Sequence, residues 1–362
     1  MPDRKPMGDD RVDPMPHTVG IDADVSVVLS ISRHFDTVRL VLEHLAAQTI
    51  ADRLEIVLLA ESDAIEVDES TLAAFAGWQL AVPTDFTSAG NLRAEGVRMA
   101  RATRVWFAED HGFPAPGTLE ALRRVYDEHD AITGVVMENA NPATAISWAD
   151  MFLNFGPYVG RPELEDLGHL AWHKNMYPRD LLLECDAKLD DFLDVESELQ
   201  EWIRSRGGRL MIVPDAPLYH LNVSRFDTFV ETQAINGRLY GASRSAGWPV
   251  WKRLSYAAAF PLILAVRLRR LVAEVVRAGE GKRVPKMLPF LSIGLTVNQF
   301  WETVGYVVGA RDSRVRKHDA EYRRYRFMTA ADCRRIFRDP DGRPPRSLVA
   351  GWTSLNGQAG HD

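Results

Sequence analysis

Cysteine is scarce in this sequence, and no long apolar run stands near its start. Cys185 and Cys333 are the only thiols among 362 residues. They form neither a disulfide framework nor a metal-ligand pair by spacing, which favours a reducing compartment. Residues 1–22 are polar and proline-rich, so we expect a flexible tail there and no signal peptide. The resulting expectation is a cytoplasmic protein.

No glycine immediately follows the first predicted strand. The sequence also contains no internal repeat. Residues 30–35, directly after the first predicted strand, contain no glycine. A nucleotidyltransferase on a similar sheet would need a glycine-rich, basic phosphate loop at that point, so this class is disfavoured. With 46% hydrophobic residues, the chain can bury one large core with an appendage, or form two domains.

The charge is unevenly distributed along the chain. Residues 252–346 hold 21 basic and 9 acidic residues, whereas the rest of the chain holds 22 basic and 41 acidic ones. Because this basic third also contains apolar segments, it indicates an anionic surface such as the cytoplasmic leaflet of a membrane; no nucleic-acid partner is predicted.

Residues 251–310 are predicted to form amphipathic helices at such a surface, so that the protein would be membrane-peripheral. A membrane span is disfavoured because Asn298, Gln299 and Glu302 lie within the longest apolar run, where they would be costly at bilayer depth. The alternative is a helical subdomain that packs against the rest of the protein.

Strands and helices are expected to alternate through the first two thirds of the chain. This alternation predicts an α/β fold with a mostly parallel sheet covered on both faces. The expected strands are residues 24–32, 54–60, 79–82, 104–108, 131–137 and 210–213; the expected helices are 37–48, 72–78, 90–102, 117–129, 146–154, 178–185 and 196–206. The expected divisions are a flexible tail at 1–22, an α/β domain at 23–245, a basic helical region at 246–338 and a disordered tail at 339–362.

An acidic stretch with one histidine follows the predicted strand at 104–108. Glu109, Asp110 and His111 would stand at the carboxyl end of that strand, which is where open α/β sheets bind ligands. Carboxylates suit Mg²⁺ and Mn²⁺, and an imidazole shifts the preference toward Mn²⁺. The stretch therefore indicates a divalent-cation site, and the alternative is an acidic loop whose histidine caps the following helix.

Five segments, taken in order, resemble the landmarks of the family two glycosyltransferases over residues 24–240. They are Val-Ser-Val-Val at 25–28 with a helix end at 46–49, Ala-Gly-Asn-Leu-Arg-Ala-Glu-Gly at 89–96, Phe-Ala-Glu-Asp-His-Gly-Phe-Pro at 107–114, Glu-Ser-Glu-Leu at 196–199, and Val-Pro-Asp-Ala-Pro-Leu-Tyr-His at 213–220. The resemblance implies a GT-A-like three-layer sandwich. It also implies inverting, hexosyltransferase-type transfer of a sugar from a nucleotide-diphosphate donor, expected to be a UDP-sugar, to a hydroxyl of a glycan, lipid-linked or small-molecule acceptor.

The resemblance also implies how the leaving diphosphate is neutralised. The family's strand-end Asp-x-Asp corresponds here to Glu109 and His111, and His220 corresponds to a further metal or diphosphate contact. These three would hold Mn²⁺ or Mg²⁺, while Asp110 would face the ribose or sugar of the donor. The alternative for His220 is a structural histidine.

The catalytic base of the family corresponds to Glu196, which would take the proton of the acceptor hydroxyl. Glutamate replaces the family's aspartate, and Val195 replaces the preceding acid. The alternative is that Glu196 and Glu198 only favour a helix N-terminus electrostatically.

Donor and acceptor residues follow from the same resemblance. Ser30, Glu61, Asn91 and Arg93 would contact the nucleotide-sugar, although the segments around Ser30 and Glu61 depart from the family pattern and Asn91 is equally suited to helix capping.

Trp172, His173 and Asn175 would line the sugar and acceptor side, where an aromatic face suits a sugar ring, although a tryptophan is more often part of a core. The alternative for the whole chain is a non-catalytic sugar-nucleotide-binding or scaffold protein with a degenerate domain of this kind.

Overall fold

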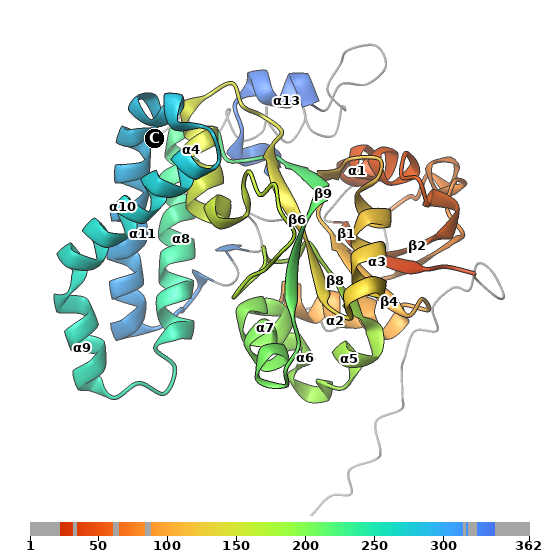
Figure 1. Ribbon diagram of the computed structural model, residues 1–362, viewed down its shortest axis with the longest axis horizontal. Coiled ribbons are helices and arrows are strands. Elements are labelled where there is room, and N and C mark those ends of the chain that lie inside the picture. The colour runs from red at the N-terminus through yellow and green to blue at the C-terminus, as the bar shows by residue number, and fades with distance from the viewer. Residues whose placement is uncertain are drawn as a thin grey trace, which may run out of the picture.

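A computed structural model describes residues 22–31, 35–60, 65–83, 88–313, 316–317 and 324–336, and a curled sheet forms its centre (Figure 1). The strands follow the order β3-β2-β1-β4-β8-β6-β9-β5, and β7 pairs with β9. Six strands run in the same direction: β1 (Val25–Ile31), β2 (Leu54–Ala60), β3 (Gly77–Ala81), β4 (Arg104–Ala108), β6 (Ile132–Asn139) and β9 (Leu210–His220). Three short strands run antiparallel to them: β5 (Gly112–Pro114), β7 (Glu165–Asp166) and β8 (Asn175–Pro178).

Helices cover both faces of the sheet. One face packs against α1 (Asp36–Ala46), α3 (Thr118–His129) and α4 (Ala145–Phe155). The other face packs against α2 (Ala89–Met99), α5 (Arg179–Leu183), α6 (Leu189–Asp194) and α7 (Glu196–Ser205). Every residue of β1 and β2 is buried, as expected for central strands with both faces covered. The predicted α/β fold with a mostly parallel sheet is confirmed, and the arrangement is consistent with a GT-A-like fold.

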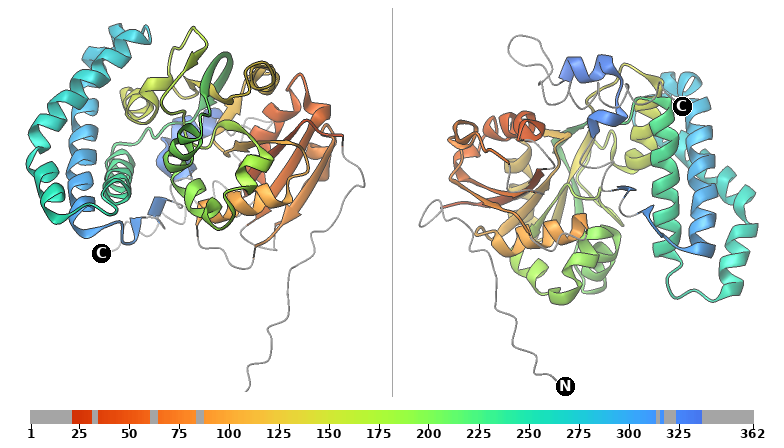
Figure 2. Two further views of the ribbon diagram at one scale, coloured as in Figure 1. Left: turned by 60° about the horizontal axis from the view of Figure 1, so that its bottom comes forward. Right: turned by 180° about the vertical axis from the view of Figure 1, so that it is seen from behind.

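The last third of the described chain forms a layer of helices beside the sheet (Figure 2). It contains α8 (Phe226–Arg244), α9 (Val250–Ala258), α10 (Phe260–Arg277) and α11 (Val284–Val308), and the short α13 (Ala330–Ile336) follows. Close approach of α8 and α11 requires glycine, because a Cβ on Gly237 or Gly241 would lie 2.1 Å from a carbonyl oxygen of α11. The predicted helical C-terminal region is therefore confirmed.

The polar residues in the middle of α11 face protein partners. Arg267 of α10 donates to Gln299 (2.7 Å), Glu302 (2.6 Å) and Asn298 (3.2 Å). These contacts give the three side chains a role in joining α10 to α11. Within the described ranges, no helix is long and apolar enough to cross a membrane.

One predicted helix is wrong, and several short elements are additional. Residues 72–78 are not helical: a 3₁₀ turn at Glu69–Leu72 precedes β3, which begins at Gly77. Only residues 73–76 lie between the 3₁₀ turn and β3. This segment is about one helical turn long, which is too short to offset the cost of helix nucleation. The strands β5, β7 and β8 and the helix α6 had no counterpart among the predicted elements. The predicted tails at 1–22 and 339–362 lie, apart from Asp22, outside the described residues.

Candidate functional site

Three strand ends bring one carboxylate and two imidazoles together. Glu109 directly follows β4, and His220 is the last residue of β9. The pairing of β5 with β9 places Gly112 opposite His220, and the carbonyl of His111 accepts a hydrogen bond from the backbone N–H of Leu221 at 2.9 Å. As a result, the rings of His111 and His220 have centroids 4.9 Å apart, and one potential ligand atom from each of the three side chains lies within 4.8 Å of the others.

Hydrogen bonds to the far nitrogen orient both imidazoles. Nδ1 of His111 lies 2.6 Å from a carboxylate oxygen of Asp110. Nδ1 of His220 lies 3.0 Å from Oδ1 of Asn222, whose amide nitrogen donates elsewhere, so the acceptor faces the imidazole. Each Nδ1 is then the protonated nitrogen, and each Nε2 presents its lone pair on the side of Glu109, which is the arrangement of metal-ligating histidines.

The distances among these atoms fit a divalent cation. Oε2 of Glu109 lies 3.4 Å from Nε2 of His111 and 3.9 Å from Nε2 of His220. Neighbouring ligand atoms on an ion with bonds of about 2.1 Å lie about 3.0 Å apart in octahedral and about 3.4 Å apart in tetrahedral geometry. Because the three ligand atoms lie within 4.8 Å of one another, the side chains would have to close in on the ion to complete three ligand positions.

Positive charges surround Glu109. Nζ of the buried Lys174 lies 2.6 Å from Oε2, yet that oxygen accepts no well-aligned hydrogen bond from any described residue. Burial alone would raise the pKa of Glu109, but the ammonium of Lys174, followed by the charges that His220 and His173 carry once protonated and by that of Arg93, outweighs it and lowers the pKa to about 2. The carboxylate is therefore ionised at neutral pH and is held by charges more than by directed bonds.

A second buried carboxylate, Glu196, begins α7 and is held differently. Oε1 accepts from Nδ2 of Asn175 (2.7 Å) and from the hydroxyl of Tyr177. Oε2 accepts from the backbone N–H of His173 and lies 3.1 Å from Nδ1 of the same residue. Burial would raise the pKa of Glu196, but the hydrogen bonds and charge of His173, with the bond from Tyr177, lower it to about 2.

The segment that enters β8 links the two carboxylates. His173 and Lys174 directly precede β8, and Asn175 and Tyr177 lie within it. His173, Asn175 and Tyr177 contact Glu196, while Lys174 contacts Glu109. His173 has a left-handed backbone, with φ of 59°, a conformation that is strained for this residue type. Burial, followed by the charge of Arg93, lowers the pKa of His173 although Glu196 opposes the shift, so the neutral imidazole is favoured.

The predicted donor residues have different surroundings. Ser30 is buried near the carboxyl end of β1, and Glu61 lies outside the described residues. The side chain of Asn91 donates to Asp190 at 2.9 Å and ties α2 to α6, while Ser88 caps α2. Arg93 is buried on α2, close enough for its charge to act on Glu109 and His173. Of these four residues, Arg93 is the one whose charge acts on Glu109 and on His173.

The residues predicted for the sugar and acceptor side also differ in burial and in their contacts. Asn175 is buried and bound to Glu196, whereas Trp172 is half-buried, with its ring 6.1 Å from that of His173. Nζ of Lys317 lies 4.8 Å from the centre of the Trp172 ring. Trp172 is therefore the more accessible of the two.

Three residues of the site were missing from the prediction: Lys174, Tyr177 and Asn222. The polar alternation of His173, Asn175 and Tyr177 was a usable sign of a strand with one polar face. Asn222 stands two residues beyond His220, and its amide oxygen can orient that imidazole as metal-binding histidines require. No sequence signal distinguishes Lys174 from a surface lysine.

Comparison with known proteins gives structural likenesses only. No protein-family profile matches the chain, and no curated protein matches it. Among solved structures, S. aureus TarS 1–349 in complex with UDP-GlcNAc aligns with 90% of this chain and 83% of its own, at 12% identity and a TM-score of 0.42. GalNAc-T7 with UDP, GalNAc and Mn²⁺ aligns with 54% of this chain and 43% of its own, at 14% identity and a TM-score of 0.42.

A longer TarS structure is matched over 76% of this chain at 14% identity and a TM-score of 0.42, and the chain spans only 55% of that structure's length. Because these TM-scores are below 0.5, the likenesses carry no argument about the chemistry of this chain.

Proposed function

We propose that this protein is an inverting glycosyltransferase that moves a sugar from a nucleotide-diphosphate donor, with UDP-sugars as the first candidates, to an acceptor hydroxyl. The observation that supports it best is the convergence of Glu109, His111 and His220 at the carboxyl edge of the sheet, with both imidazoles oriented by a hydrogen bond at Nδ1. A second buried acid–imidazole pair stands on the neighbouring segment. A charge-neutralising site beside a proton acceptor is what displacement of a diphosphate requires.

Glu109, His111 and His220 would hold a divalent cation, Mn²⁺ or Mg²⁺. The cation would stabilise the negative charge that develops on the leaving diphosphate. Asp110 and Asn222 orient the two histidines. Asp110 would act chiefly by orienting His111. It would also contact the ribose or sugar of the donor.

Glu196 would act as base together with His173. Its two oxygens already receive hydrogen bonds from His173, Asn175 and Tyr177, so direct attack on an acceptor proton would cost part of this network. Nδ1 of His173 lies 3.1 Å from Oε2 of Glu196 without a well-aligned hydrogen bond to any described residue. In this proposal Nδ1 carries the proton of the neutral ring, and Nε2 is the proton-accepting nitrogen. The acceptor oxygen would then bond to the anomeric carbon, its proton would pass to His173, and the carbon–oxygen bond to the diphosphate would break.

The deciding experiment is a thermal-shift screen followed by turnover. A nucleotide-sugar that binds the folded state raises the melting temperature in proportion to its affinity. UDP, UDP-GlcNAc and UDP-GalNAc, each with and without Mn²⁺, are suitable first probes, since the similar structures hold UDP, UDP-GlcNAc, or UDP with GalNAc. Mn²⁺-dependent stabilisation with donor hydrolysis or transfer would support the proposal. Stabilisation without turnover against an acceptor panel would favour the non-catalytic sugar-nucleotide-binding alternative.

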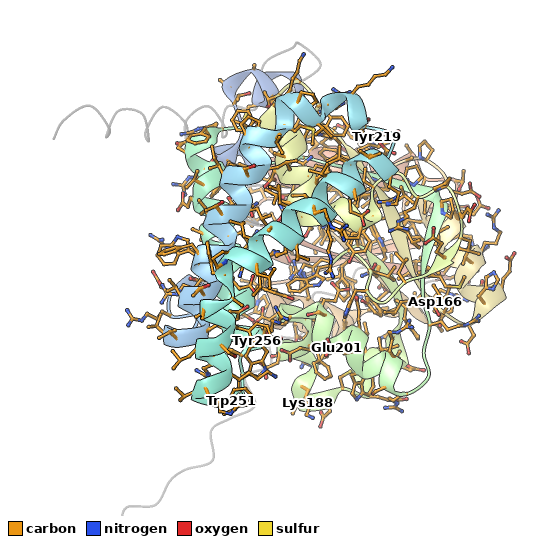
Figure 3. The ribbon with its side chains drawn as sticks, turned by 60° about the vertical axis from the view of Figure 1, so that its left-hand side comes forward. Asp166, Lys188, Glu201, Tyr219, Trp251 and Tyr256 are labelled. Carbon is orange, nitrogen blue, oxygen red and sulfur yellow. The ribbon has the colours of Figure 1, made fainter. Side chains whose placement is uncertain are left out.

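We also propose that residues 251–310 rest on an anionic membrane surface. Trp251 of α9 is 70% exposed, Leu262 of α10 is 69% exposed and Phe300 of α11 is 54% exposed; Figure 3 shows Trp251 at one end of this layer. Exposed basic residues without an ion pair to any described residue accompany them: Arg269, Arg270, Lys282 and Lys286. Each basic side chain near anionic lipid contributes roughly 1 kcal/mol, and apolar side chains add burial.

Vesicle sedimentation tests this location. The protein is expected to sediment with vesicles of phosphatidylcholine and phosphatidylglycerol, and much less with phosphatidylcholine alone or at high salt. A Trp251→Ser, Leu262→Ser variant should lose most of this binding, whereas Leu164→Ser, which alters an exposed leucine of the sheet domain, should keep it. Equal sedimentation of both variants would contradict the proposal, as would concentration-dependent dimerisation through this face without vesicle binding.

A further inference from the structure

Lys174 stands beside the proposed cation site. Its Nζ lies 2.6 Å from Oε2 of Glu109, donates to the carbonyl of Trp172 at 3.1 Å and lies 5.0 Å from the centre of the Phe155 ring. The side chain is only 5% exposed. It is therefore a buried cation whose ion-pair partner among the described residues is the carboxylate proposed as a metal ligand.

The ammonium and a metal ion would compete for the same oxygen. Oε2 of Glu109 is also the atom nearest Nε2 of His111, at 3.4 Å, and Nε2 of His220, at 3.9 Å. A dication about 2.1 Å from Oε2 would lie within a few ångströms of Nζ, where two positive charges in a buried site repel each other strongly. Glu109 can therefore serve one of the two cations at a time.

We propose that Lys174 is a displaceable counter-ion that couples metal binding to diphosphate binding, an inference that rests on the proposed function. Without a donor, its ammonium neutralises Glu109. When a divalent cation binds Glu109, His111 and His220, the ammonium moves off the carboxylate and binds a diphosphate oxygen. No covalent bond forms or breaks in this exchange.

Two features of the site favour exchange over a fixed salt bridge. The remaining contacts of Nζ are one carbonyl and one aromatic face, which hold an ammonium less firmly than a carboxylate does. The four-carbon stem of lysine is flexible, so the charge can move without displacing the backbone of β8. In addition, Asp110 and Asn222 orient the imidazoles toward Glu109, a provision that a lysine–glutamate pair alone does not need.

The inference predicts reciprocal coupling between metal and nucleotide. Because Mn²⁺ alone must displace Lys174 without a new partner for the ammonium, its affinity should be low. UDP supplies that partner and should raise the affinity for Mn²⁺ by about tenfold, within the usual range of coupling between two ligands. By linkage, Mn²⁺ should raise the affinity for UDP by the same factor.

Electron paramagnetic resonance of free Mn²⁺ measures this coupling without any turnover. Lys174→Met keeps the length of the side chain and removes its charge, so it should bind Mn²⁺ alone about tenfold more tightly than the wild type and should lose most of the effect of UDP. Lys188→Met is the matched control, since Lys188 is exposed on the surface (Figure 3), and it should behave as the wild type.

The outcomes separate the two proposals. Unchanged or weaker Mn²⁺ binding by a folded Lys174→Met variant would overturn the role of Lys174. If that variant does not fold, the wild type still decides, because Mn²⁺ affinity that is independent of UDP excludes the coupling. Tighter Mn²⁺ binding by Lys174→Met with no turnover of any nucleotide-sugar by the wild type would keep the counter-ion role and reject the transferase.

Discussion

The side chains of Glu109 and Glu196 are only 7% and 0% exposed, and the pKa of each is lowered to about 2 by different means. Around Glu109 the stabilisation is electrostatic: an ammonium, a guanidinium and imidazoles stand near an oxygen that accepts no well-aligned hydrogen bond among the described residues. Around Glu196 the stabilisation is directional, with a hydroxyl, an amide and the backbone of His173 bonded to its oxygens.

This difference separates two uses of a buried carboxylate. A carboxylate held by charges can exchange one cation for another, as metal binding requires, because charge attraction has little directionality. A carboxylate held by several aligned hydrogen bonds has a fixed position and orients its donors in return. The same residue type thus serves as an ion site in one place and as a positioning group in the other.

The largest expected effects are on turnover, and substitutions of the two carboxylates should differ in whether Mn²⁺ binding is kept. Glu196→Gln removes the carboxylate that pairs with the proton-accepting His173 and is expected to lower kcat by about 10²–10⁴-fold, the usual contribution of a general base, while Mn²⁺ binding persists. Glu109→Gln should abolish Mn²⁺ binding together with activity. Steady-state kinetics and Mn²⁺ titration measure both effects, and Glu198→Gln, an exposed neighbour on α7, is the control. Metal-dependent turnover retained in Glu196→Gln would show that the base lies elsewhere.

Acid should destabilise the protein through both groups. Each folded-state pKa of about 2 is below the ordinary 4.5, so each contribution is fully present above about pH 4.5 and is lost as the pH falls toward 2. A difference of this size corresponds to about 3 kcal/mol per carboxylate. Urea unfolding between pH 5 and pH 2 measures it, and Glu196→Gln should flatten the pH dependence by about half. An unchanged slope would contradict the depressed pKa of Glu196.

Removing an orienting partner should weaken metal binding without unfolding the protein. Asn222→Ala deletes the acceptor for Nδ1 of His220 and should reduce Mn²⁺ affinity by about 10- to 100-fold. Isothermal titration calorimetry gives this value directly. Asn236→Ala, a half-buried amide of α8 that contacts Asn154, is the comparison variant. Equal Mn²⁺ affinity in the two variants would argue against His220 as a ligand.

A further expected effect, on stability and not on metal binding, concerns one hydrogen bond to Glu196. Tyr177→Phe removes a hydroxyl that donates to Oε1 and should lower the free energy of unfolding by about 1.5–3 kcal/mol, the usual contribution of a bond to a charged group. Mn²⁺ affinity should not change. A loss of Mn²⁺ binding in this variant would mean that the two carboxylates are not independent.

Local sequence patterns were sufficient for the long elements and for the ends of strands. The apolar runs at 54–60 and 104–108 coincide with β2 and β4, since central parallel strands are continuous apolar runs. The convergence of Glu109, His111 and His220 was expected, because carboxyl ends of parallel strands meet at one edge. Their roles, and that of Glu196, stay predictions.

The parts that escaped prediction depend on partners distant in sequence. The three residues of β5 form a strand only because β9 lies beside them, and β8 forms between β4 and β6. The orientation of Lys174 follows from the placement of β8. The hydrogen bond from Asn91 to Asp190 likewise depends on α6 packing against α2. Such contacts have no local pattern, which is why the resemblance indicated Asn91 as a donor residue while Lys174 passed unnoticed.

The four-residue strand β8 makes the site unusually sensitive to the length of the segment before it. The two residues directly before β8, His173 and Lys174, reach different carboxylates from adjacent positions. A deletion or insertion of one residue between Gly168 and Trp172 that shifted the pairing by one position would send the ammonium toward Glu196 and the imidazole toward Glu109. The fold could survive such an indel, since β8 is short, but the two chemical environments would be interchanged. Loop length here is therefore a determinant of chemistry, and grafting experiments on this protein should keep it constant.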